Sequence, residues 1–199
     1  MIIDIVRSNF KIIIFGFVFT FFSCIGQSFF IGLFNYDIRN ELNITHGEFG
    51  TIYAVATLCS SFTLIWVGKK IDDLKLINYS FVVVFFLSFS ALFFSFVNGI
   101  AFLAIGIFFL RLSGQGLMAH TASVAVTRFF DQSRGKALSY AWIGMSLGEF
   151  LLPLIIVYLL TFIYWRDLWQ GFAFIIILIL PIFTYLTVKE ISKFSREDK

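Results

Sequence analysis

Six apolar runs, each long enough to cross a lipid bilayer, account for most of this 199-residue chain. A hydrocarbon core about 30 Å thick requires about 20 apolar residues per helix. Hydrophobic residues make up 59% of the chain and charged residues 14%, a balance far from that of soluble domains. The sequence therefore predicts an all-α membrane protein, with six transmembrane helices in residues 1–188 and a charged tail in residues 189–199. The predicted helices lie at about 11–34, 47–67, 77–97, 100–127, 136–160 and 169–188.

The first apolar run follows a basic start, as a secretory signal peptide would. The run from Ile12 to Phe34 is too long for such a peptide, and no small-x-small cleavage site ends it, so we expect a first transmembrane helix. Only a short polar stretch at Asn98 and Gly99 separates the third and fourth runs. We expect a tight external turn there, because a single helix of about 50 residues would be far longer than a bilayer needs.

Lysine and arginine orient the bundle, because these residues collect in cytoplasmic loops. Alternate loops divide them twelve to two, and the smaller set is Arg39 and Arg166. We therefore expect a multi-pass protein of the cell's inner (plasma) membrane with both termini in the cytoplasm. The net charge of +3 reflects this topology rather than a nucleic-acid partner. The larger set comprises Arg7, Lys11, Lys69, Lys70, Lys75, Arg128, Arg134, Lys136, Lys189, Lys193, Arg196 and Lys199.

Two ionisable residues lie deep within the fourth and fifth predicted helices. Arg111 is about eleven residues into its helix, near the middle of the bilayer, where an unpaired arginine facing lipid costs about 2.5–3.5 kcal/mol. Glu149 lies within about one helical turn of the same depth. The two side chains could form a static ion pair. Alternatively, Arg111 binds an anionic substrate while Glu149 responds to protonation.

Further polar side chains accompany Arg111. Gln115 lies one turn away on the same face, where its amide extends an anion site or bonds to a neighbouring helix. Gln27, in the outer part of the first helix, either lines a cavity or is satisfied between helices. His120 lies on the opposite side of its helix, and we expect it to pack near the cytoplasmic end together with Ser113, Gly116 and Ser123.

Small residues and one proline characterise the fifth helix. Gly144 and Gly148 form a G-x-x-x-G pair, which allows two helices to pack backbone to backbone. Pro153 removes a backbone hydrogen bond from the carbonyl of Glu149 and is expected to kink the helix. In the loop after the second helix, Asp72 has three possible roles: it caps the next helix, pairs with Arg128, or remains a solvated charge.

Four motifs, in order along the chain, resemble the N-terminal half of a major facilitator superfamily transporter. They are "GKKIDDLK", "RLSGQG", "RFFDQSRGKALSYAWIGMSLGEFLLP" and "YWRDLWQGF". The first departs from the family pattern, because Asp73 stands at a basic position and Leu76 replaces a further basic residue. The third is similar to bacterial members related to monocarboxylate and oxalate/formate carriers.

The resemblance implies a half of the superfamily fold, built as a 3+3 inverted repeat, and secondary transport by proton coupling or exchange. Arg111 would hold a small organic anion such as a monocarboxylate, and Gly68, Asp72 and Arg128 would form a gating latch. Because the superfamily fold has two six-helix halves, we expect a second half from a separate chain, a missing segment or a homodimer. The alternative is a six-span scaffold or assembly protein that transports nothing.

The sequence predicts no enzymatic activity. Intramembrane enzymes need a cluster such as paired aspartates, a Ser/His dyad or an H-E-x-x-H helix, and the chain has none of these patterns. We likewise expect no metal site and no nucleotide or organic cofactor. The expected partners are membrane lipid, the anion and the second half.

Overall fold

The chain folds into an elongated bundle of helices. The computed structural model describes residues 10–130 and 133–197, with side chains described as far as residue 188. These residues contain helices and no strand, so the prediction of an all-α protein is confirmed. The elements are α2 (Phe10–Ser23), the 3-10 turn η1 (Cys24–Gly26), α3 (Ser28–Leu33), α4 (Asn35–Leu42), α5 (His46–Asp73), α6 (Leu76–Ser95), α7 (Ile100–Leu110), the π-helical segment η2 (Arg111–Met118), α8 (Ala119–Phe129), α9 (Arg134–Leu159) and α10 (Trp165–Glu197).

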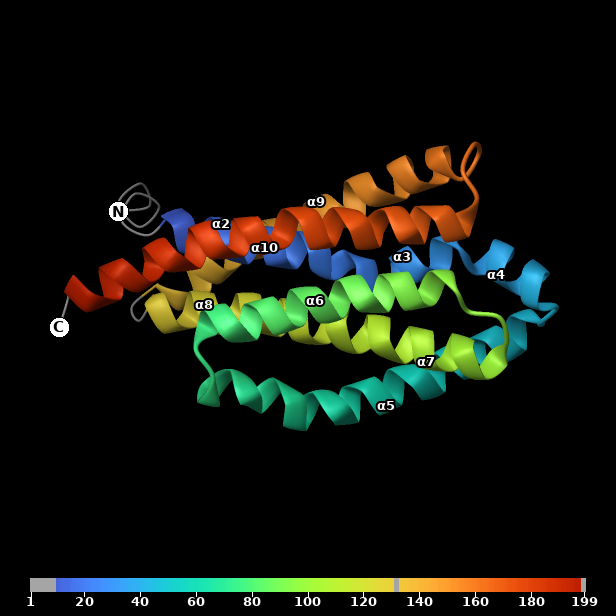
Figure 1. Cartoon of the computed structure of the whole chain (residues 1–199), viewed down its shortest axis with the longest axis horizontal. Coiled ribbons are helices and arrows are strands. Elements are labelled where there is room, and N and C mark those ends of the chain that lie inside the picture. Colours follow the sequence, from blue (N-terminus) through green and yellow to red (C-terminus); the bar gives the residue numbers. More distant parts are fainter. Residues whose placement is uncertain (1–9, 131–132, 198–199) are drawn as a thin grey trace.

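Five helical segments of the described chain are long and apolar enough to cross a membrane. They are α5, α6, α9, α10 up to Val188, and the continuous helix Ile100–Phe129 that α7, η2 and α8 form together. The connections lie at alternate ends of the bundle, and both chain ends are at the same end (Figure 1). The helix α10 continues to Glu197, so most of the stretch predicted as a tail extends the sixth helix.

The first apolar run is not one helix, contrary to the prediction for residues 11–34. It is divided into α2, η1 and α3, and Gln27 between η1 and α3 has an extended backbone (φ −81°, ψ 156°). The N–H of Gln27 closes the 3-10 turn on the carbonyl of Cys24, and its own carbonyl accepts from Ile31 at the start of α3. The pieces still follow one another across the bundle (Figure 1). The break therefore lies inside the first passage.

The short helix α4 and the start of α5 form a compact turn at the end opposite the chain ends. Asn43 ends α4 in the left-handed conformation (φ 53°), which asparagine tolerates better than most residues. Thr45 then begins α5 with a capping box: its hydroxyl accepts from the N–H of Glu48, and the Glu48 carboxylate accepts from the N–H of Thr45. The expected turn between the third and fourth helices is also present, between Ser95 and Ile100.

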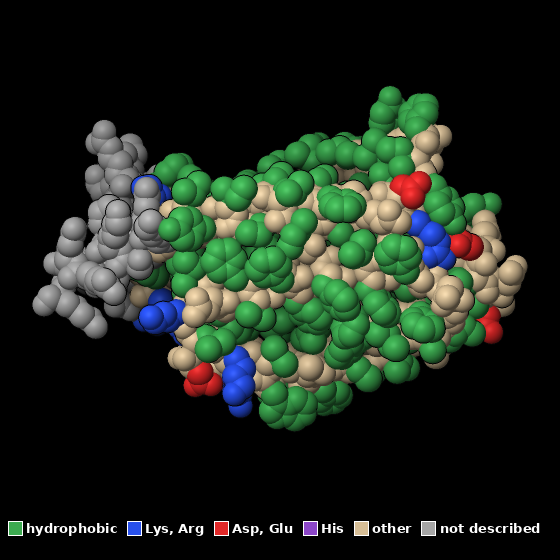
Figure 2. Space-filling model, in the orientation of Figure 1, with side chains coloured by type: hydrophobic (Ala, Val, Ile, Leu, Met, Phe, Trp, Pro, Cys, Tyr) green, Lys and Arg blue, Asp and Glu red, His purple; other side chains and the backbone are tan. Residues whose placement is uncertain are grey.

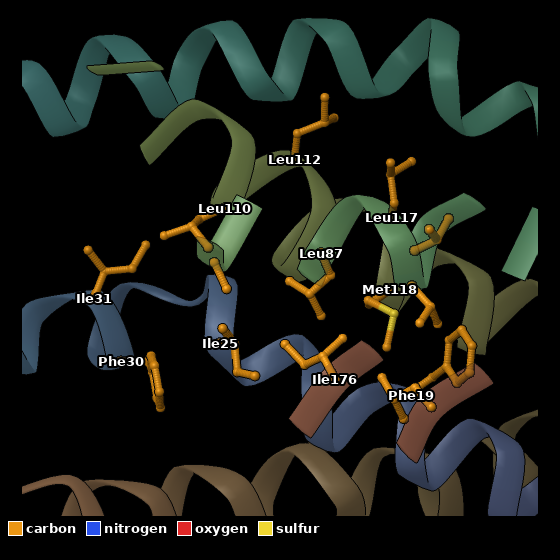
Figure 3. Close-up of a cluster of buried hydrophobic side chains, with 14 of the residues drawn as sticks. Phe19, Ile25, Phe30, Ile31, Leu87, Leu110, Leu112, Leu117, Met118 and Ile176 are labelled. Carbon is orange, nitrogen blue, oxygen red and sulfur yellow. The ribbon is translucent and has the colours of Figure 1, made fainter. Parts of the chain in front are cut away.

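Apolar side chains from four passages meet in the core. Figure 3 shows Phe19, Ile25 and Phe30 from the first passage, Leu87 from α6, Leu110 and Met118 from the fourth passage and Ile176 from α10, all buried. In the same view Leu112 and Leu117 point toward α5. The π-helical segment therefore contacts the core on one side and α5 on the other.

The glycine pair of α9 packs directly on the first passage. A Cβ on Gly144 would lie 2.0 Å from the carbonyl oxygen of Phe17, and one on Gly148 would lie 2.6 Å from Sγ of Cys24. No larger residue fits at either position without moving the backbone or the sulfur. Pro153 lies two turns before the end of α9, and the helix continues past it to Leu159.

A cluster of hydrogen bonds holds the outer turns together; we call Glu41, Tyr164, Trp165 and Arg166 the Glu41 cluster. The Glu41 carboxylate accepts from Tyr164 Oη, from Trp165 Nε1 (2.7 Å), and from Arg166 Nε (2.9 Å) and Nη2 (2.7 Å). Arg166 also donates to the carbonyls of Ser95, the last residue of α6, and of Val97 in the turn that follows. Partial burial opposes ionisation, but hydrogen bonds from Arg166, Tyr164 and Trp165 outweigh it and hold the pKa of Glu41 below its usual value. The cluster thus joins α4, α6 and α10.

Most of the outer surface between the two ends is apolar. In Figure 2 the charged side chains gather at the ends of the visible face, with a broad hydrophobic zone between them. Many large apolar side chains of α5, α9 and α10 are exposed, among them Phe62, Phe150 and Leu178. Hydrocarbon covers such a surface at no cost, as a bundle in a bilayer requires.

Candidate functional site

Arg111 is buried in the middle of the continuous helix Ile100–Phe129, at the first residue of η2. Only 8% of the residue is exposed. Its Nη1 donates to the carbonyl of Gly26 (3.3 Å) and to the hydroxyl of Ser28 (3.2 Å), on either side of the break in the first passage. The guanidinium lies 5.4 Å from the centroid of the Tyr53 ring, and Tyr53 Oη donates to Ser28 Oγ. The arginine thus links the first, second and fourth passages.

The guanidinium of Arg111 is only partly satisfied. Its Nε is buried without a hydrogen-bond partner, and no carboxylate of the described residues forms an ion pair with it. The postulated pairing with Glu149 is absent, because Glu149 is exposed on α9. The first passage lies between the two: its Gly26 contacts Arg111, while its Cys24 contacts Gly148. Arg111 and Glu149 were predicted to lie at similar depth in the bilayer. Similar depth does not mean contact here, because the two helices lie on opposite sides of the first passage.

Two backbones cross closely beside Arg111. A Cβ on Gly26 would lie 2.2 Å from the carbonyl oxygen of Leu110, and one on Gly114 would lie 2.6 Å from the backbone N of Gly26. The 3-10 turn and the π-helical segment therefore touch where each departs from α-helical geometry. Short π-helical segments are rare and occur often at functional sites. The small residues in "SCIGQS" and "RLSGQG" are the sequence signal for this crossing, which was not predicted.

A small cavity lies between α5 and η2, next to Arg111. Its volume is about 120 Å³, and its lining residues are Ser60, Ser61, Leu64, Arg111, Gln115 and Gly116. Arg111 and Gln115 share it, as expected for residues on one face, and Oε1 of Gln115 is buried without a partner. Gly116, which we expected on the side of His120, lines this cavity instead. The π-helical winding of η2 explains the difference, since the expectation assumed 3.6 residues per turn.

Some predicted site residues lie elsewhere, and some lining residues were not predicted. Gln27 is buried but is not among the residues that line the cavity. Ser28 and Tyr53, which contact Arg111, and Ser60 and Ser61, which line the cavity, were not singled out from the sequence. Isolated hydroxyl residues in apolar helices more often bond to their own backbone, so their types alone gave little signal.

The second predicted group lies between the ends of α5 and α8. Arg128 forms an ion pair with Asp72 (Nη2 to Oδ1, 2.7 Å) and donates to the carbonyl of Ile71. His120 Nε2 donates to the carbonyl of Gly68 (3.2 Å). A Cβ on Gly68 would meet the imidazole at 3.5 Å, an ordinary contact, so His120 does not require a glycine there. Gly68, Asp72 and His120 also line a cavity of about 300 Å³ with Leu64, Ile65 and Lys69.

No group of three or more His, Cys, Asp or Glu side chains in the described part of the chain is arranged to hold a metal ion. The chemical possibilities of the cavity beside Arg111 are therefore those of its own lining: one fixed cation, hydroxyl and amide groups, and an apolar wall.

Residues 16–199 match the Major Facilitator Superfamily. The chain belongs to this superfamily. No curated protein and no solved structure matches it. The resemblance expected from the four motifs is thus confirmed for the superfamily, and the all-helical bundle agrees with one half of its fold. The chain is a multi-pass membrane protein of a transporter family, which is not enzymatic.

Proposed function

We propose that this chain provides one half of a secondary transporter for a small organic anion such as a monocarboxylate. Arg111 binds the anion, Gln115 completes the site, and transport is coupled to protons or to exchange of a second anion. The single observation that supports this function is the buried guanidinium of Arg111: the residue lines a cavity, its Nε has no hydrogen-bond partner, and no carboxylate of the described residues pairs with it. An ionised group in that state is costly within a membrane unless a ligand or water compensates it.

A second six-helix unit supplies the opposite wall of the site in this proposal. Helix α5 borders the cavity, and only 11% of its most apolar 18-residue window is buried inside the bundle. Lipid could cover the apolar side chains of α5, but hydrocarbon beside a polar cavity with an arginine is unfavourable. A second unit against this face would enclose the anion between two halves.

We propose that the protein lies in the inner (plasma) membrane, with both chain ends in the cytoplasm. The α5–α6 and α8–α9 connections lie at the same end of the bundle as the chain ends (Figure 1). The described basic residues at those connections are Lys69, Lys70, Lys75, Arg128, Arg134 and Lys136. Such an excess of lysine and arginine favours the cytoplasmic side.

Glu149 is our candidate for proton coupling. It lies well inside α9, it is exposed, and it forms no ion pair among the described residues. A charged carboxylate facing hydrocarbon is costly, so Glu149 requires a proton, water or a polar partner from the second half. Glu149→Gln is expected to abolish the pH dependence of uptake while preserving anion binding.

We further propose that Gly68, Asp72 and Arg128 form a gate at the cytoplasmic end. The ion pair between Asp72 and Arg128 joins the ends of α5 and α8, beside the larger cavity. Because both side chains are substantially exposed, the pair can separate at little cost when the second half moves.

Binding of radiolabelled propanoate to the purified chain, together with uptake into cells that produce it, tests the anion site. Arg111→Ala should weaken binding about 10- to 100-fold, because hydrogen bonds to charged groups contribute about 1.5–3 kcal/mol. Arg111→Lys should also bind more weakly, since lysine lacks the bidentate fork. Arg39→Ala is the matched control, because Arg39 lies in α4, outside the cavity, and donates to Asn35. Undiminished binding and uptake in both Arg111 variants would refute the role of Arg111.

A further inference from the structure

A free hydroxyl proton lies beside the guanidinium of Arg111, at the break in the first passage. Ser28 Oγ accepts from Arg111 Nη1 (3.2 Å) and from Tyr53 Oη (2.8 Å), so both of its lone pairs are used. The proton of Ser28 has no acceptor among the described residues. Two hydroxyls that bond to each other use only one of their two protons, so one O–H donor remains at this position whichever of them donates.

Arg111 supplies a second donor at the same place. Its Nη1 is used in the bonds to Gly26 and Ser28, whereas Nη2 has no hydrogen-bond partner among the described residues. Nε is enclosed by the surrounding protein, and Nη2 is not. Because Nη1 and Nη2 are the two ends of one rigid fork, Nη2 lies close to the hydroxyl that Nη1 contacts. The break in the first passage therefore has an N–H donor and an O–H donor side by side.

The surroundings of these two donors favour an anion. Ser28 is exposed, and no carboxylate of the described residues pairs with the arginine beside it. A hydroxyl whose oxygen accepts from a cation is polarised and becomes a stronger donor. Two neighbouring donors match the two oxygens of one carboxylate. A free O–H that faces hydrocarbon is unfavourable, so this position requires a polar partner within the membrane.

We infer that Ser28 is a second ligand-binding residue of the anion site: its hydroxyl donates to one carboxylate oxygen, and Nη2 of Arg111 donates to the other. Tyr53 supports the pair through its bond to Ser28 Oγ and through its ring, whose centroid lies 5.4 Å from Cζ of Arg111. The inference rests on the proposed function. It extends the site beyond the lining of the small cavity, which includes neither Ser28 nor Tyr53.

Binding of propanoate to the purified full chain tests the role of Ser28. Ser28→Ala should weaken binding about tenfold, as expected for the loss of one hydrogen bond to a charged group. Ser28→Thr keeps the hydroxyl and should retain the affinity of the unmodified chain. Tyr53→Phe should also retain it, because Ser28 keeps its proton and the ring stays beside Arg111. Ser139→Ala is the matched control, since Ser139 is an exposed serine of α9 that donates to the carbonyl of Gly135.

The affinities of these variants separate the inference from the proposed function. Unchanged binding in Ser28→Ala, together with weakened binding in Arg111→Ala, would overturn the inference and leave the anion site intact. Weakened binding in Tyr53→Phe but not in Ser28→Ala would assign the donor to Tyr53 and would also overturn it. If the unmodified chain binds no propanoate, the proposed function itself is wrong.

Melting temperatures without ligand separate a lost donor from a damaged fold. Ser28→Ala should melt near the temperature of the unmodified chain, because Arg111 keeps its bond to Gly26. A large fall in melting temperature would make Ser28 a structural support of the arginine and overturn the inference. If Ser28→Ala does not fold, Ser28→Cys replaces it, since a thiol is a weak donor of similar size. Equal propanoate affinity in Ser28→Cys and Ser28→Thr would then contradict the role of the hydroxyl.

Discussion

Two arginines in this molecule have opposite environments. Arg166, in the Glu41 cluster, uses Nε and both terminal nitrogens in hydrogen bonds, has a carboxylate partner and stacks on the Trp165 ring with its Cζ 4.5 Å from the centroid. Arg111, in the middle of the bundle, bonds through Nη1 alone and has no carboxylate partner among the described residues. Arg166 is also the more exposed of the two, although all three of its nitrogens form hydrogen bonds.

The difference separates a structural cation from a binding cation. Arg166 joins three connections and uses all three of its nitrogens in hydrogen bonds, so its removal should damage the fold. Arg111 retains a buried donor beside a cavity, so its removal should damage binding more than the fold. The sequence around an arginine in an apolar helix does not show whether the arginine is structural or binds a ligand, because exposure to lipid is costly in either case.

Among the variants that follow, the largest loss of stability should come from a change at the backbone crossing that positions Arg111. In Gly114→Ala the new Cβ would meet the backbone of Gly26 at 2.6–2.7 Å, and overpacking of this kind costs about 1–3 kcal/mol. Gly171→Ala is the control, because nothing lies within 4 Å of its Cβ position. Thermal unfolding in detergent measures both variants. Equal melting temperatures for the two would contradict the close crossing.

Glu41→Gln tests whether the outer cluster is structural. It removes the charge that accepts from Tyr164, Trp165 and Arg166, and we expect a loss of about 1–2 kcal/mol, reduced by partial solvent exposure. Propanoate binding should not change. Asp37→Asn in the same helix is the control, because Asp37 forms no ion pair among the described residues. If Glu41→Gln weakened propanoate binding and Asp37→Asn did not, the distinction between a structural Arg166 and a binding Arg111 would be wrong.

The same carboxylate gives a smaller, pH-dependent effect. Hydrogen bonds from Arg166, Tyr164 and Trp165 lower the pKa of Glu41 despite the opposing effect of burial. A group with a lowered pKa stabilises the fold above its unfolded value, about 4.3 for glutamate, and loses this contribution as the pH falls through the folded value. The difference in melting temperature between the unmodified chain and Glu41→Gln should therefore shrink below about pH 4. A constant or growing difference down to pH 3 would be inconsistent with the assigned shift.

The smallest effect is expected at the exposed ion pair between Asp72 and Arg128. The side chains are 73% and 38% exposed, and such pairs contribute about 0–1 kcal/mol. Asp72→Asn should leave the melting temperature nearly unchanged and affect transport instead. A loss of stability equal to that of Glu41→Gln would assign the pair a structural role.

The apolar pattern of the sequence was sufficient for the helices and insufficient for their irregularities. Runs of about 20 apolar residues correctly indicated an all-helical membrane protein, and four motifs indicated the superfamily. The break at Gln27 and the π-helical segment were not predicted, because both lie where Gly26 and Gly114, which are 88 residues apart, come into contact. Helix α4 was missed because its polar residues lack the apolar pattern used to find the others.

The candidate site was predictable in part for the same reason. Arg111 and Gln115 share a cavity because they are close in sequence on one helix. Whether Arg111 pairs with Glu149 depends on which helices are neighbours. The depth of each residue in the bilayer does not show which helices are neighbours. Ser28, Tyr53, Ser60 and Ser61 come from other passages, so only the packed bundle identifies them as neighbours of Arg111.

Parallel measurement of melting temperature and propanoate affinity in Arg111→Ala and Arg166→Ala tests the central claim most directly. Arg166→Ala should lower the melting temperature and retain the affinity of the unmodified chain. Arg111→Ala should retain most of the melting temperature and lose binding about 10- to 100-fold. If Arg111→Ala unfolds as readily as Arg166→Ala while still binding propanoate, Arg111 is a structural residue and the anion site lies elsewhere.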